Sequence, residues 1–561
     1  MLGFASTGPL LVGQKRSLGP QKSQSRKSIW RCRLRTSPIN RAAKSIKNDE
    51  NENRGRICTS LTGSSVTQQL RQIREAVDAG ADLVEIRVDL LHGQSGDEWE
   101  RILRKASLPT IVTNRASWEG GNCQTSEIQR LQSLLRAVQL GTQHIDVELR
   151  AMPLFRQCLQ SNGLSLPLES TKLIISYHDF DNSLTPKQID QILDKMRSAG
   201  ADICKIAMTA TSALDNCTVF HALKRAQTPS IILAMGEIGQ PTRILAPKFR
   251  SYLSFAAVGE GAGSAPGQIS ARSLKQMYRF HDIKPSTPAY GVIGNPISHS
   301  MSPALHNAAM AKNGLNGVFV ACKVEADYPE FIRGMCDLGF NGFSVTIPAK
   351  GAAIAAMDYM DDVAQRIGAM NTVVKQRDGT LKGYNTDWVA AISAIEDHLS
   401  NGMKGKSVVC IGAGGAGKAL AYGALERGAL RVCIVNRTKG KAETLAQELG
   451  DKAIAVSLEE FNSSDWDYEV LMNTTSVGMY PRIEDTPVKK ERLIGGSVVF
   501  DAVYNPLKTR LLSEAESRGC VTVSGLEMFV RQAAEQFRLW FPDENVPIET
   551  MRRAVLEKLC S

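Results

Sequence analysis

The sequence predicts an α/β protein, with an N-terminal (β/α)8 barrel followed by a two-lobed α/β region. Two observations carry this prediction. Apolar runs of strand length alternate with amphipathic stretches between residues 55 and 282, and their count and spacing are those of a (β/α)8 barrel. A Gly-rich loop near residue 412 stands between a predicted strand and a predicted helix, which indicates an open parallel sheet. The chain of 561 residues is also too long for one hydrophobic core.

The barrel is predicted from eight strand-like runs, at 57–63, 82–89, 109–115, 144–149, 172–179, 203–210, 230–237 and 253–259. The stretches between them, such as 66–81 and 127–141, carry apolar residues at helical spacing and Gly near the exit. An open doubly wound sheet uses the same units. Eight repeats without a Gly-rich phosphate loop favour the closed form instead.

Polar side chains gather at the carboxyl ends of these strands, the face where barrel active sites lie. They are Glu85, Arg87, Asp89, Arg115, Glu148, His178, Asp179, Lys205 and Arg243. A salt bridge within the barrel explains any one carboxylate here equally well. Lys205 differs because it lies between Cys204 and Ile206 in an otherwise apolar run. Burial of an ammonium is costly and favours the free amine that a nucleophile needs. With His178 on the preceding strand, Lys205 predicts a Schiff-base site for a carbonyl substrate.

The net charge of +10 is concentrated at the N-terminus. Residues 1–48 hold eleven Lys and Arg and no Asp or Glu, so the remainder carries 10 − 11, about −1. A near-neutral folded part argues against nucleic-acid binding. The basic, Ser-rich head predicts a plastid transit peptide over residues 1–50, and a basic tail without a targeting role is the alternative.

Other sequence signals are weak. No apolar run is long enough to span a bilayer. The twelve Cys are scattered without C-x-x-C spacing, so we expect no metal site and a reducing compartment.

The second region begins after a Pro-rich linker at 283–289. Residues 290–310 read as a strand, a turn and a helix, and Ser298, Ser300 and Ser302 crowd the helix start. Capping explains one of these hydroxyls, and binding of an anionic or polyhydroxylated ligand would explain the others. The predicted strand at 340–350 closes with Thr346 and Lys350, and NTDW (385–388) supplies Asp387.

A dinucleotide site is predicted further on. Gly412, Gly414 and Gly417 form G-x-G-x-x-G between the strand 407–411 and a helix that stops near Gly428, and the strand 431–435 follows. Where an NAD enzyme would place an acid, this chain has Asn436, Arg437 and Thr438, which favours NADP because Arg437 can pair with the extra phosphate. The alternative is that Arg437 is a solvated loop residue and that the site takes NAD.

The motifs EIRVD (85–89), SYHDF (176–180), CKIAM (204–208) and SAPGQIS (264–270) resemble the type I 3-dehydroquinate dehydratase family, across 55–282. The resemblance implies that Lys205 forms an imine with the substrate ketone. His178 would serve as general base and acid, and Glu148 would be the carboxylate that positions this His. The implied substrate-binding residues are Glu85, Arg87, Arg243, Ser264 and Gln268.

The motifs GNPISHSMSP (294–303), VTIPAK (345–350), NTDW, GAGGAGKA (412–419), NRT (436–438), NTTSVGM (473–479), YNPLKT (504–509) and GLEMFVRQAAEQF (525–537) resemble shikimate dehydrogenase, over 288–545. This implies Lys350 as the catalytic residue with Asp387 beside it; a structural salt bridge is the alternative for the pair. Implied substrate-binding residues are Ser300, Ser302, Thr346, Asn371, Tyr504 and Gln532. Implied cofactor-binding residues are Gly412, Ala413, Gly414, Gly415, Ala416, Gly417, Asn436, Arg437, Thr438 and Met528.

Together the halves resemble the plant bifunctional 3-dehydroquinate dehydratase/shikimate dehydrogenase family. We therefore predict a transit peptide at 1–50, the dehydratase barrel at 55–282, a substrate-binding lobe at 288–390, an NADP-binding Rossmann lobe at 391–525, and C-terminal helices at 526–561 that return to the substrate lobe. The family implies dehydration of 3-dehydroquinate and NADPH-dependent reduction of 3-dehydroshikimate to shikimate, in the plastid.

Two alternatives stay open at this level. The dehydrogenase half could prefer quinate, since Met301 and Ala349 stand where plant members commonly carry Lys and His. The dehydratase half could be reduced to a binding module, although Lys205, His178 and Glu148 are retained. Only small-molecule partners are expected, without nucleic acid or membrane. The sequence leaves the oligomeric state open, a monomer included.

Overall fold

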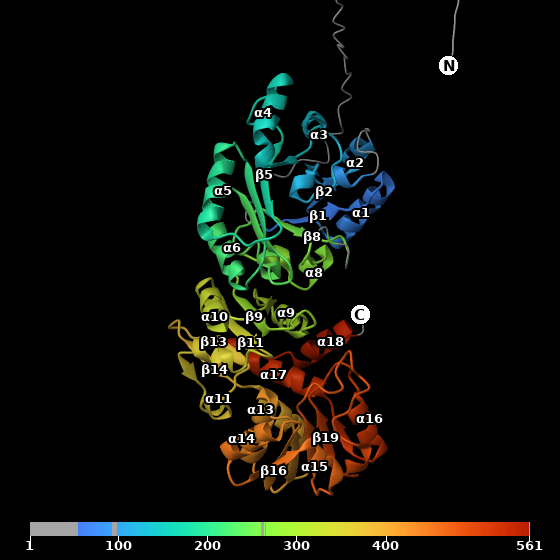
Figure 1. Ribbon diagram of the computed structural model, residues 1–561, viewed down its shortest axis with the longest axis vertical. Coiled ribbons are helices and arrows are strands. Elements are labelled where there is room, and N and C mark those ends of the chain that lie inside the picture. Colours follow the sequence, from blue (N-terminus) through green and yellow to red (C-terminus); the bar gives the residue numbers. More distant parts are fainter. Residues whose placement is uncertain (1–53, 92–97, 260–262, 264, 560–561) are drawn as a thin grey trace, which may run out of the picture. The chain divides into compact units, whose positions relative to one another are not determined.

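The computed structural model describes residues 54–91, 98–259, 263 and 265–559 (Figure 1). The predicted transit peptide and Ser264 therefore lie outside the described residues. In the part that is described, no helix has the length and apolar character needed to cross a membrane.

The N-terminal part is the predicted (β/α)8 barrel. Its parallel strands pair in the order β7-β6-β5-β4-β3-β2-β1-β8. The strands are β1 (Ile57–Leu61), β2 (Leu83–Arg87), β3 (Thr110–Thr113), β4 (His144–Glu148), β5 (Lys172–Asp179), β6 (Ile203–Thr209), β7 (Ser230–Met235) and β8 (Ser254–Ala256). Between β8 and β7 the backbone N–H of Tyr252 donates to the Ser230 carbonyl at 2.8 Å, which brings the last strand next to the seventh. All eight strand runs predicted from the sequence are confirmed.

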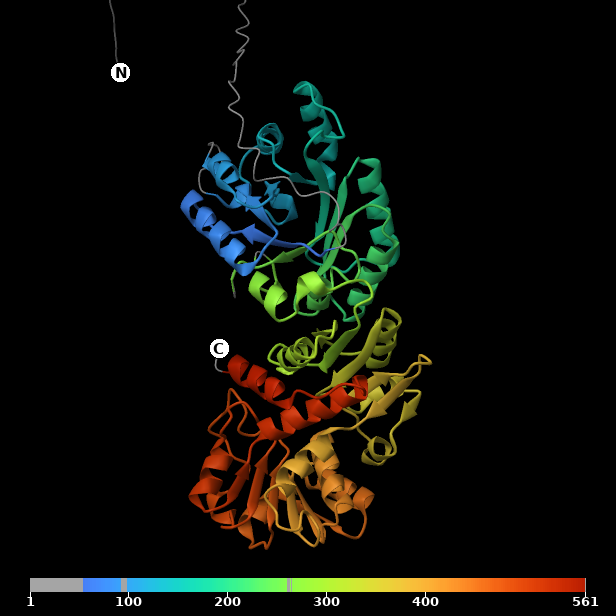
Figure 2. The same ribbon diagram turned by 180° about the vertical axis from the view of Figure 1, so that it is seen from behind.

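Helices surround the ring of strands, as both views of the molecule show (Figures 1 and 2). They are α1 (Val66–Ala79), α2 (Glu98–Lys105), α3 (Glu127–Gln139), α4 (Met152–Ser161), α5 (Pro186–Ser198), α6 (Leu214–Arg225), α7 (Gln240–Ile244) and α8 (Ala271–Gln276). Several begin at side-chain caps: Ser126 before α3 and Thr185 before α5 each form a capping box with the Gln three residues on.

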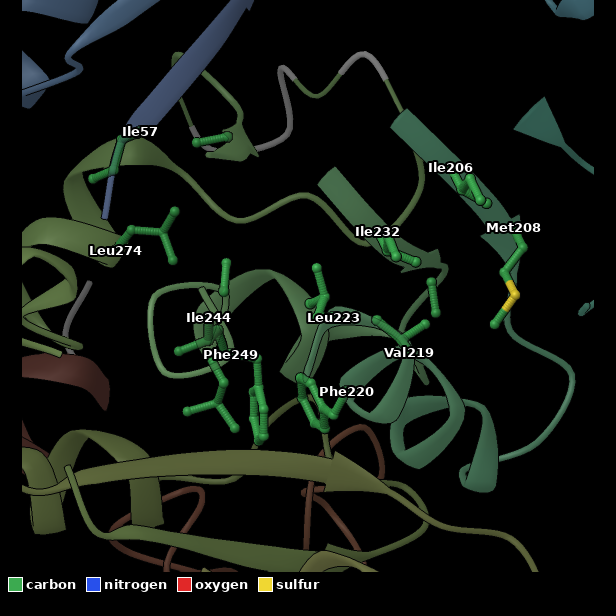
Figure 3. Close-up of a cluster of buried hydrophobic side chains, with 14 of the residues drawn as sticks. Ile57, Ile206, Met208, Val219, Phe220, Leu223, Ile232, Ile244, Phe249 and Leu274 are labelled. Carbon is green, nitrogen blue, oxygen red and sulfur yellow. The ribbon is translucent and has the colours of Figure 1, made fainter. Parts of the chain in front are cut away.

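Side chains of the strands alternate between two apolar layers. Ile206 and Met208 of β6 and Ile232 of β7 belong to the outer layer and lie over Val219, Phe220 and Leu223 of α6 (Figure 3). Ile203 and Ala207 belong to the inner cluster of the barrel. Lys205 has the same parity as these two residues, so the alternation directs its side chain into the barrel.

The second part starts with a six-stranded sheet ordered β10-β9-β11-β13-β14-β12, with antiparallel pairs only at β11–β13 and β13–β14. Its strands are β9 (Ala289–Gly294), β10 (Val318–Lys323), β11 (Phe340–Val345), β12 (Tyr359–Met360), β13 (Thr372–Lys375) and β14 (Leu381–Tyr384). The accompanying helices are α9 (Ser302–Lys312), α10 (Tyr328–Asp337), α11 (Asp362–Ile367) and α12 (Asp387–Glu396).

The third sheet is fully parallel, in the order β17-β16-β15-β18-β19-β20. This is the strand order of a Rossmann sheet, with the switch point between β15 and β18. Its strands are β15 (Ser407–Ile411), β16 (Arg431–Asn436), β17 (Ala453–Ser457), β18 (Val470–Asn473), β19 (Val498–Asp501) and β20 (Val521–Val523). The helices between them are α13 (Gly415–Glu426), α14 (Lys439–Leu449), α15 (Leu458–Ser463) and α16 (Arg510–Ser517).

The last two helices return to the second sheet. Helix α17 (Gly525–Trp540) contacts β11 and β13, and its Trp540 indole N–H donates to the Val373 carbonyl at 3.0 Å. Helix α18 (Ile548–Leu559) packs on α9. Both helices are coloured red in Figures 1 and 2. They place Gln532 and Gln536 of α17 beside the strands that end at the second candidate site.

Candidate active sites

A cavity of about 220 Å³ lies among the residues at the carboxyl ends of the barrel strands. Its lining brings together most of the residues predicted for the first site, namely Glu85, Arg87, His178, Lys205, Arg243 and Gln268. Ser264 is outside the described residues, so its predicted contact stays a prediction.

Lys205 is 5% exposed and stands among opposite charges. Its Nζ lies 2.8 Å from Asp146 Oδ2, 4.0 Å from Glu85 Oε1 and 4.4 Å from the centre of the Phe255 ring. The sequence predicted the burial of this amine correctly. It did not predict the carboxylate of Asp146 beside the amine.

His178 borders the same cavity. Burial lowers the pKa of His178 well below its usual value, and Arg115 and Lys205 lower it further. The ring is therefore neutral at neutral pH, the state that a general base requires. Its Nδ1 lies 3.4 Å from Glu119 Oε2, and its backbone N–H donates to Glu119 Oε1 at 3.2 Å. This contact leaves Nε2 as the ring nitrogen that can take up a proton.

The predicted pairing of Glu148 with His178 is wrong. The carboxylate on His178 is Glu119, in the short turn Ser117–Glu119 after β3. Glu148 is fully buried elsewhere: it accepts from the Ala116 N–H at 3.0 Å and pairs with Arg130 at 2.8 Å and with Arg115 at 3.2 Å. A carboxylate at the end of a strand is a reasonable partner for a histidine, but the Glu148 side chain contacts Arg130 and Arg115 instead.

Arg243 and Arg87 differ in their partners. Arg87 is paired in bidentate fashion with Asp89, at 2.9 and 2.7 Å. Arg243 is 2% exposed, its Nε has no hydrogen-bond partner in the described part of the chain, and its Nη1 reaches only the Phe255 carbonyl at 3.5 Å. Burial lowers the pKa of Arg243 to about 10. A buried guanidinium of this kind is suited to a carboxylate ligand.

The second candidate site centres on Lys350 and Asp387, which form an ion pair. The Asn371 side-chain amide donates to Asp387 Oδ1 at 2.8 Å and to Thr386 Oγ1 at 2.9 Å, and its nitrogen lies 3.5 Å from Gln532 Oε1. Four residues that the resemblance implied, from separate segments of the chain, therefore meet. Asp387 is 5% exposed, so its charge is screened little by solvent.

The Ser turn and the Thr346–Lys350 turn are neighbours, because β9 and β11 pair in parallel and end together. The Asn295 N–H donates to the Ile347 carbonyl at 3.1 Å, and the Thr346 N–H to the Ile293 carbonyl at 3.0 Å. Within the Ser turn, the Ser302 N–H donates to Ser300 Oγ at 3.3 Å. These contacts bring the predicted hydroxyl donors to the edge of the sheet that carries Lys350.

Tyr504 and Met528 lie farther along the chain. The Tyr504 ring stacks on Phe529 of α17 with a centroid distance of 4.6 Å, and burial raises the pKa of Tyr504. Met528 is 9% exposed and packs against the apolar core of the Rossmann lobe. Their predicted roles beside the reacting groups stay predictions.

The glycine loop fits a dinucleotide. Gly412 has φ of 109°, and a Cβ on Gly417 would lie 2.1 Å from the Gly412 carbonyl oxygen, so α13 approaches β15 only because both residues are glycine. Nothing lies within 4 Å of a Cβ placed on Gly414. Helix α13 begins at Gly415 and directs its free N–H groups toward this space, where a pyrophosphate would lie.

The turn after β16 carries the predicted cofactor selectivity. Asn436 donates to the Thr438 carbonyl at 2.9 Å, which shapes the turn, while Arg437 and Thr438 are exposed. The turn offers a cation and a hydroxyl and no carboxylate, so it suits the extra phosphate of NADP.

Two residues of the first site were missed from the sequence as site residues, Glu119 and Asp146. Glu119 follows Trp118 in what reads as a polar loop, and only its distance of four residues from Arg115 hinted at a role. Asp146 lies two residues before Glu148 on β4, so the alternation of the strand already placed both carboxylates on one face.

Comparisons with known proteins relate the two parts of the chain to two enzyme families. Residues 57–285 match the family model of type I 3-dehydroquinase. Residues 292–373 match the shikimate dehydrogenase substrate binding domain, 394–493 match shikimate/quinate 5-dehydrogenase, and 525–556 match the shikimate 5'-dehydrogenase C-terminal domain. The chain is 42% identical over 499 residues to the chloroplastic bifunctional 3-dehydroquinate dehydratase/shikimate dehydrogenase of Arabidopsis thaliana, covering 86% of this chain and 81% of the relative.

The chain belongs to the bifunctional 3-dehydroquinate dehydratase/shikimate dehydrogenase family. Its dehydrogenase half is also 38% identical over 273 residues to shikimate dehydrogenase (NADP(+)) of Bacillus cereus, which covers 48% of this chain and 98% of that relative. A solved structure of dehydroquinate dehydratase and shikimate dehydrogenase from S. pombe matches with a TM-score of 0.41 and 26% identity, over 90% of this chain and 98% of that one. The resemblances stated from the motifs are confirmed at the family level.

Proposed function

We propose that this bifunctional enzyme dehydrates 3-dehydroquinate in the barrel and then reduces the product, 3-dehydroshikimate, to shikimate with NADPH. One observation carries the first step: a buried amine, Lys205, shares a cavity with a neutral imidazole, His178. The ion pair of Lys350 with Asp387, together with the glycine loop, supports the second step.

In the barrel, Lys205 attacks the ketone carbon of the substrate and water leaves, which gives a protonated imine. The imine withdraws electrons and acidifies the adjacent C–H. His178 Nε2 takes up that proton and then delivers it to the departing hydroxyl group, a task worth about 10²–10⁴-fold in rate. Arg243 holds the substrate carboxylate, since its guanidinium has no anionic partner in the described part of the barrel.

In the dehydrogenase, Gly412–Gly417 and Arg437 would hold NADPH, which supplies a hydride to the ketone carbon when it is bound. Lys350 donates a proton to the ketone oxygen as the alcohol forms. Asp387 holds this ammonium in place through the ion pair, and Asn371 fixes the carboxylate in turn. Ser300, Ser302, Thr346 and Gln532 are the proposed contacts of the substrate hydroxyl and carboxylate groups.

A coupled assay tests both reactions. Purified full-length protein is incubated with 3-dehydroquinate and NADPH, and the product is identified by mass. We expect shikimate, with one NADPH consumed for each molecule. Accumulated 3-dehydroshikimate would contradict the reductase proposal, and unchanged substrate would contradict the dehydratase proposal. In a second assay, quinate with NADP is compared with shikimate with NADP. Faster turnover of quinate would reveal a preference for quinate.

We also propose that the enzyme works in the plastid. The basic, acid-free composition of residues 1–48 supports this location, and the Arabidopsis relative is named chloroplastic. A fluorescent protein fused behind residues 1–53 should enter plastids of plant cells. Cytosolic fluorescence would contradict the proposal, and a protein that starts at residue 49 should keep both activities.

A further inference from the structure

Asp146 is the carboxylate in hydrogen-bond contact with the reactive amine of the barrel. It lies on β4, is 1% exposed, and its Oδ2 stands 2.8 Å from Lys205 Nζ. The same oxygen lies 2.8 Å from Arg115 Nη2, and Oδ1 accepts from Ser176 Oγ at 2.6 Å. Three donors from three neighbouring segments therefore fix this carboxylate against the lysine.

Asp146 remains ionised whatever happens to Lys205. Burial by itself raises the pKa of Asp146, but the charges of Arg115 and Lys205 outweigh burial and lower the pKa well below its usual value. Arg115 stays charged at all relevant pH values, so one cation remains even after the lysine has reacted. Asp146 is thus a permanent anion and does not serve as a proton acceptor.

We infer that Asp146 is the counter-ion of the protonated imine that Lys205 forms with its ketone substrate. The inference rests on the dehydratase function proposed above. One proton of the ammonium first passes to His178, the neutral base of the cavity. The lone pair that this frees forms the C–N bond, and the π electrons of the carbonyl move to oxygen. The nitrogen begins with three protons and keeps one, and the other two leave with the oxygen as water. One positive charge stands on nitrogen before and after the step, so one fixed carboxylate serves both states.

Glu85, the second carboxylate near the amine, is less suited to this role. Its Oε1 lies 4.0 Å from Lys205 Nζ, and its two oxygens already accept from Ser60 at 2.6 Å and Thr113 at 2.8 Å. The other charged or titratable groups around the cavity come from β2, the segment after β3, β5 and α7; they are Arg87, Arg115, Glu119, His178 and Arg243. The arginines would repel a cationic imine, and Glu119 is turned to His178.

The counter-ion sets the pH range over which the imine stays protonated. A neutral imine withdraws electrons poorly, so dehydration needs the protonated form. A buried opposite charge in contact favours the charged form of a base by about 1–3 pH units. With Asp146 in place, the imine stays protonated across the working pH of the enzyme. Without it, the imine loses its proton at lower pH and the site loses its electron sink.

The test compares full-length wild type with Asp146→Asn, which keeps the shape and removes the charge. Each protein is mixed with 3-dehydroquinate and cyanoborohydride, which reduces the protonated imine, and the adduct on Lys205 is quantified by mass over a pH series. We expect the pH at which trapping is half-maximal to fall by about one unit or more in Asp146→Asn, and the dehydratase kcat to fall more than about tenfold. Asp146→Glu should restore the midpoint in part.

Glu148→Gln is the matched control, because it removes another buried carboxylate of β4 that pairs with Arg115 but has no contact with Lys205. It should leave the trapping midpoint at the wild-type value even where it lowers stability. An unchanged midpoint in Asp146→Asn would overturn the counter-ion inference. Absence of any adduct in the wild type would instead overturn the dehydratase function itself.

If Asp146→Asn does not fold, a measurement on the wild type still tests the inference. With substrate carrying ¹³C at the ketone carbon and no cyanoborohydride, the chemical shift of this carbon in the covalent intermediate distinguishes the protonated from the neutral imine. A protonated imine that persists to about pH 8 supports the inference, and a neutral imine at about pH 7 overturns it.

Discussion

The titratable side chains of the barrel site are all buried, yet some of them are neutral and others are charged. Burial drives His178 to its neutral form, whereas Arg115 and Lys205 hold Asp146 as an anion. The difference comes from the neighbours: Asp146 has three donors in contact, whereas His178 is buried near the cations Arg115 and Lys205. A base and a fixed charge can therefore share one cavity.

Glu119 gives a prediction about stability. Burial raises the pKa of Glu119 from 4.5 to about 7, against the pull of Arg115. Between these two pH values the folded state holds more protons than the unfolded state, so stability falls as pH rises through this window. Glu119→Gln cannot ionise and should lack this loss, which amounts to at most about 3 kcal/mol. Urea unfolding of the barrel from about pH 5 to 8 measures the difference.

Asp501 does not disturb this comparison. Burial also raises the pKa of Asp501, to about 6, and its effect on stability has the same sign. Both proteins contain Asp501, so it cancels in the difference between wild type and Glu119→Gln. Parallel curves for the two proteins would show that Glu119 ionises normally in the folded state.

The residues of the two sites were predictable to different degrees. Lys205 stood out because an ammonium within an apolar strand has few structural explanations. Lys350 and Asp387 lie in quoted motifs, Asn371 was implied by the family resemblance, and the structure joins the three. The role of Glu119 could not be predicted, because the sequence of a short turn does not show whether its carboxylate faces solvent or a histidine.

Among the elements, strands were predicted more reliably than the contacts at their ends. The alternation of apolar residues fixes which side chains of β6 face inward, and it placed Lys205 in the barrel correctly. It does not fix which neighbour a side chain meets. On β4, Asp146 and Glu148 share one face, yet one contacts Lys205 and the other Arg130. Partner choice depends on register between strands, which the sequence of one strand does not contain.

The contact between β15 and α13 yields a prediction about a helix. In Gly417→Ala the new methyl group would lie 2.1 Å from the Gly412 carbonyl oxygen, and backbone cannot yield cheaply. We expect the Rossmann lobe to lose about 1–3 kcal/mol and the dehydrogenase to lose NADPH affinity. In Gly440→Ala, on α14, the new methyl group would have no atom within 4 Å, so the Rossmann lobe should keep its stability or gain some. Equal melting temperatures for the two variants would contradict the close approach.

The turn between β16 and α14 yields a prediction about cofactor choice. Arg437→Ala removes the cation proposed to pair with the extra phosphate of NADPH. A charge-assisted contact contributes about 1.5–3 kcal/mol, so KM for NADPH should rise about 10–100-fold while KM for NADH stays nearly constant. Lys452→Ala is the matched control, because this exposed lysine precedes β17 at the amino edge of the sheet. An equal rise for both cofactors would argue against selection by Arg437.

At the scale of the whole molecule, each site is complete within its own part of the chain. The residues described for the dehydratase cavity run from Ser60 to Gln268, and those proposed for the dehydrogenase run from Ser300 to Gln532. The two sets of residues do not overlap. The division into two catalytic halves was predictable from the order of the motifs. The arrangement of side chains within each site depended on contacts between strands that are distant in sequence.

Separate sites should be separable by mutation. In the full-length chain, Lys205→Ala should abolish dehydration and keep reduction of 3-dehydroshikimate, while Lys350→Ala should keep dehydration and lower reduction by about 10²–10⁴-fold. Neither variant alone should convert 3-dehydroquinate to shikimate at an appreciable rate. An equimolar mixture should restore conversion after a lag, because the intermediate must leave one molecule and reach another by diffusion. NADPH oxidation and product mass are followed together. If Lys205→Ala also loses reduction while its far-UV spectrum is unchanged, the two sites depend on one another and the independence argued from their residues is wrong.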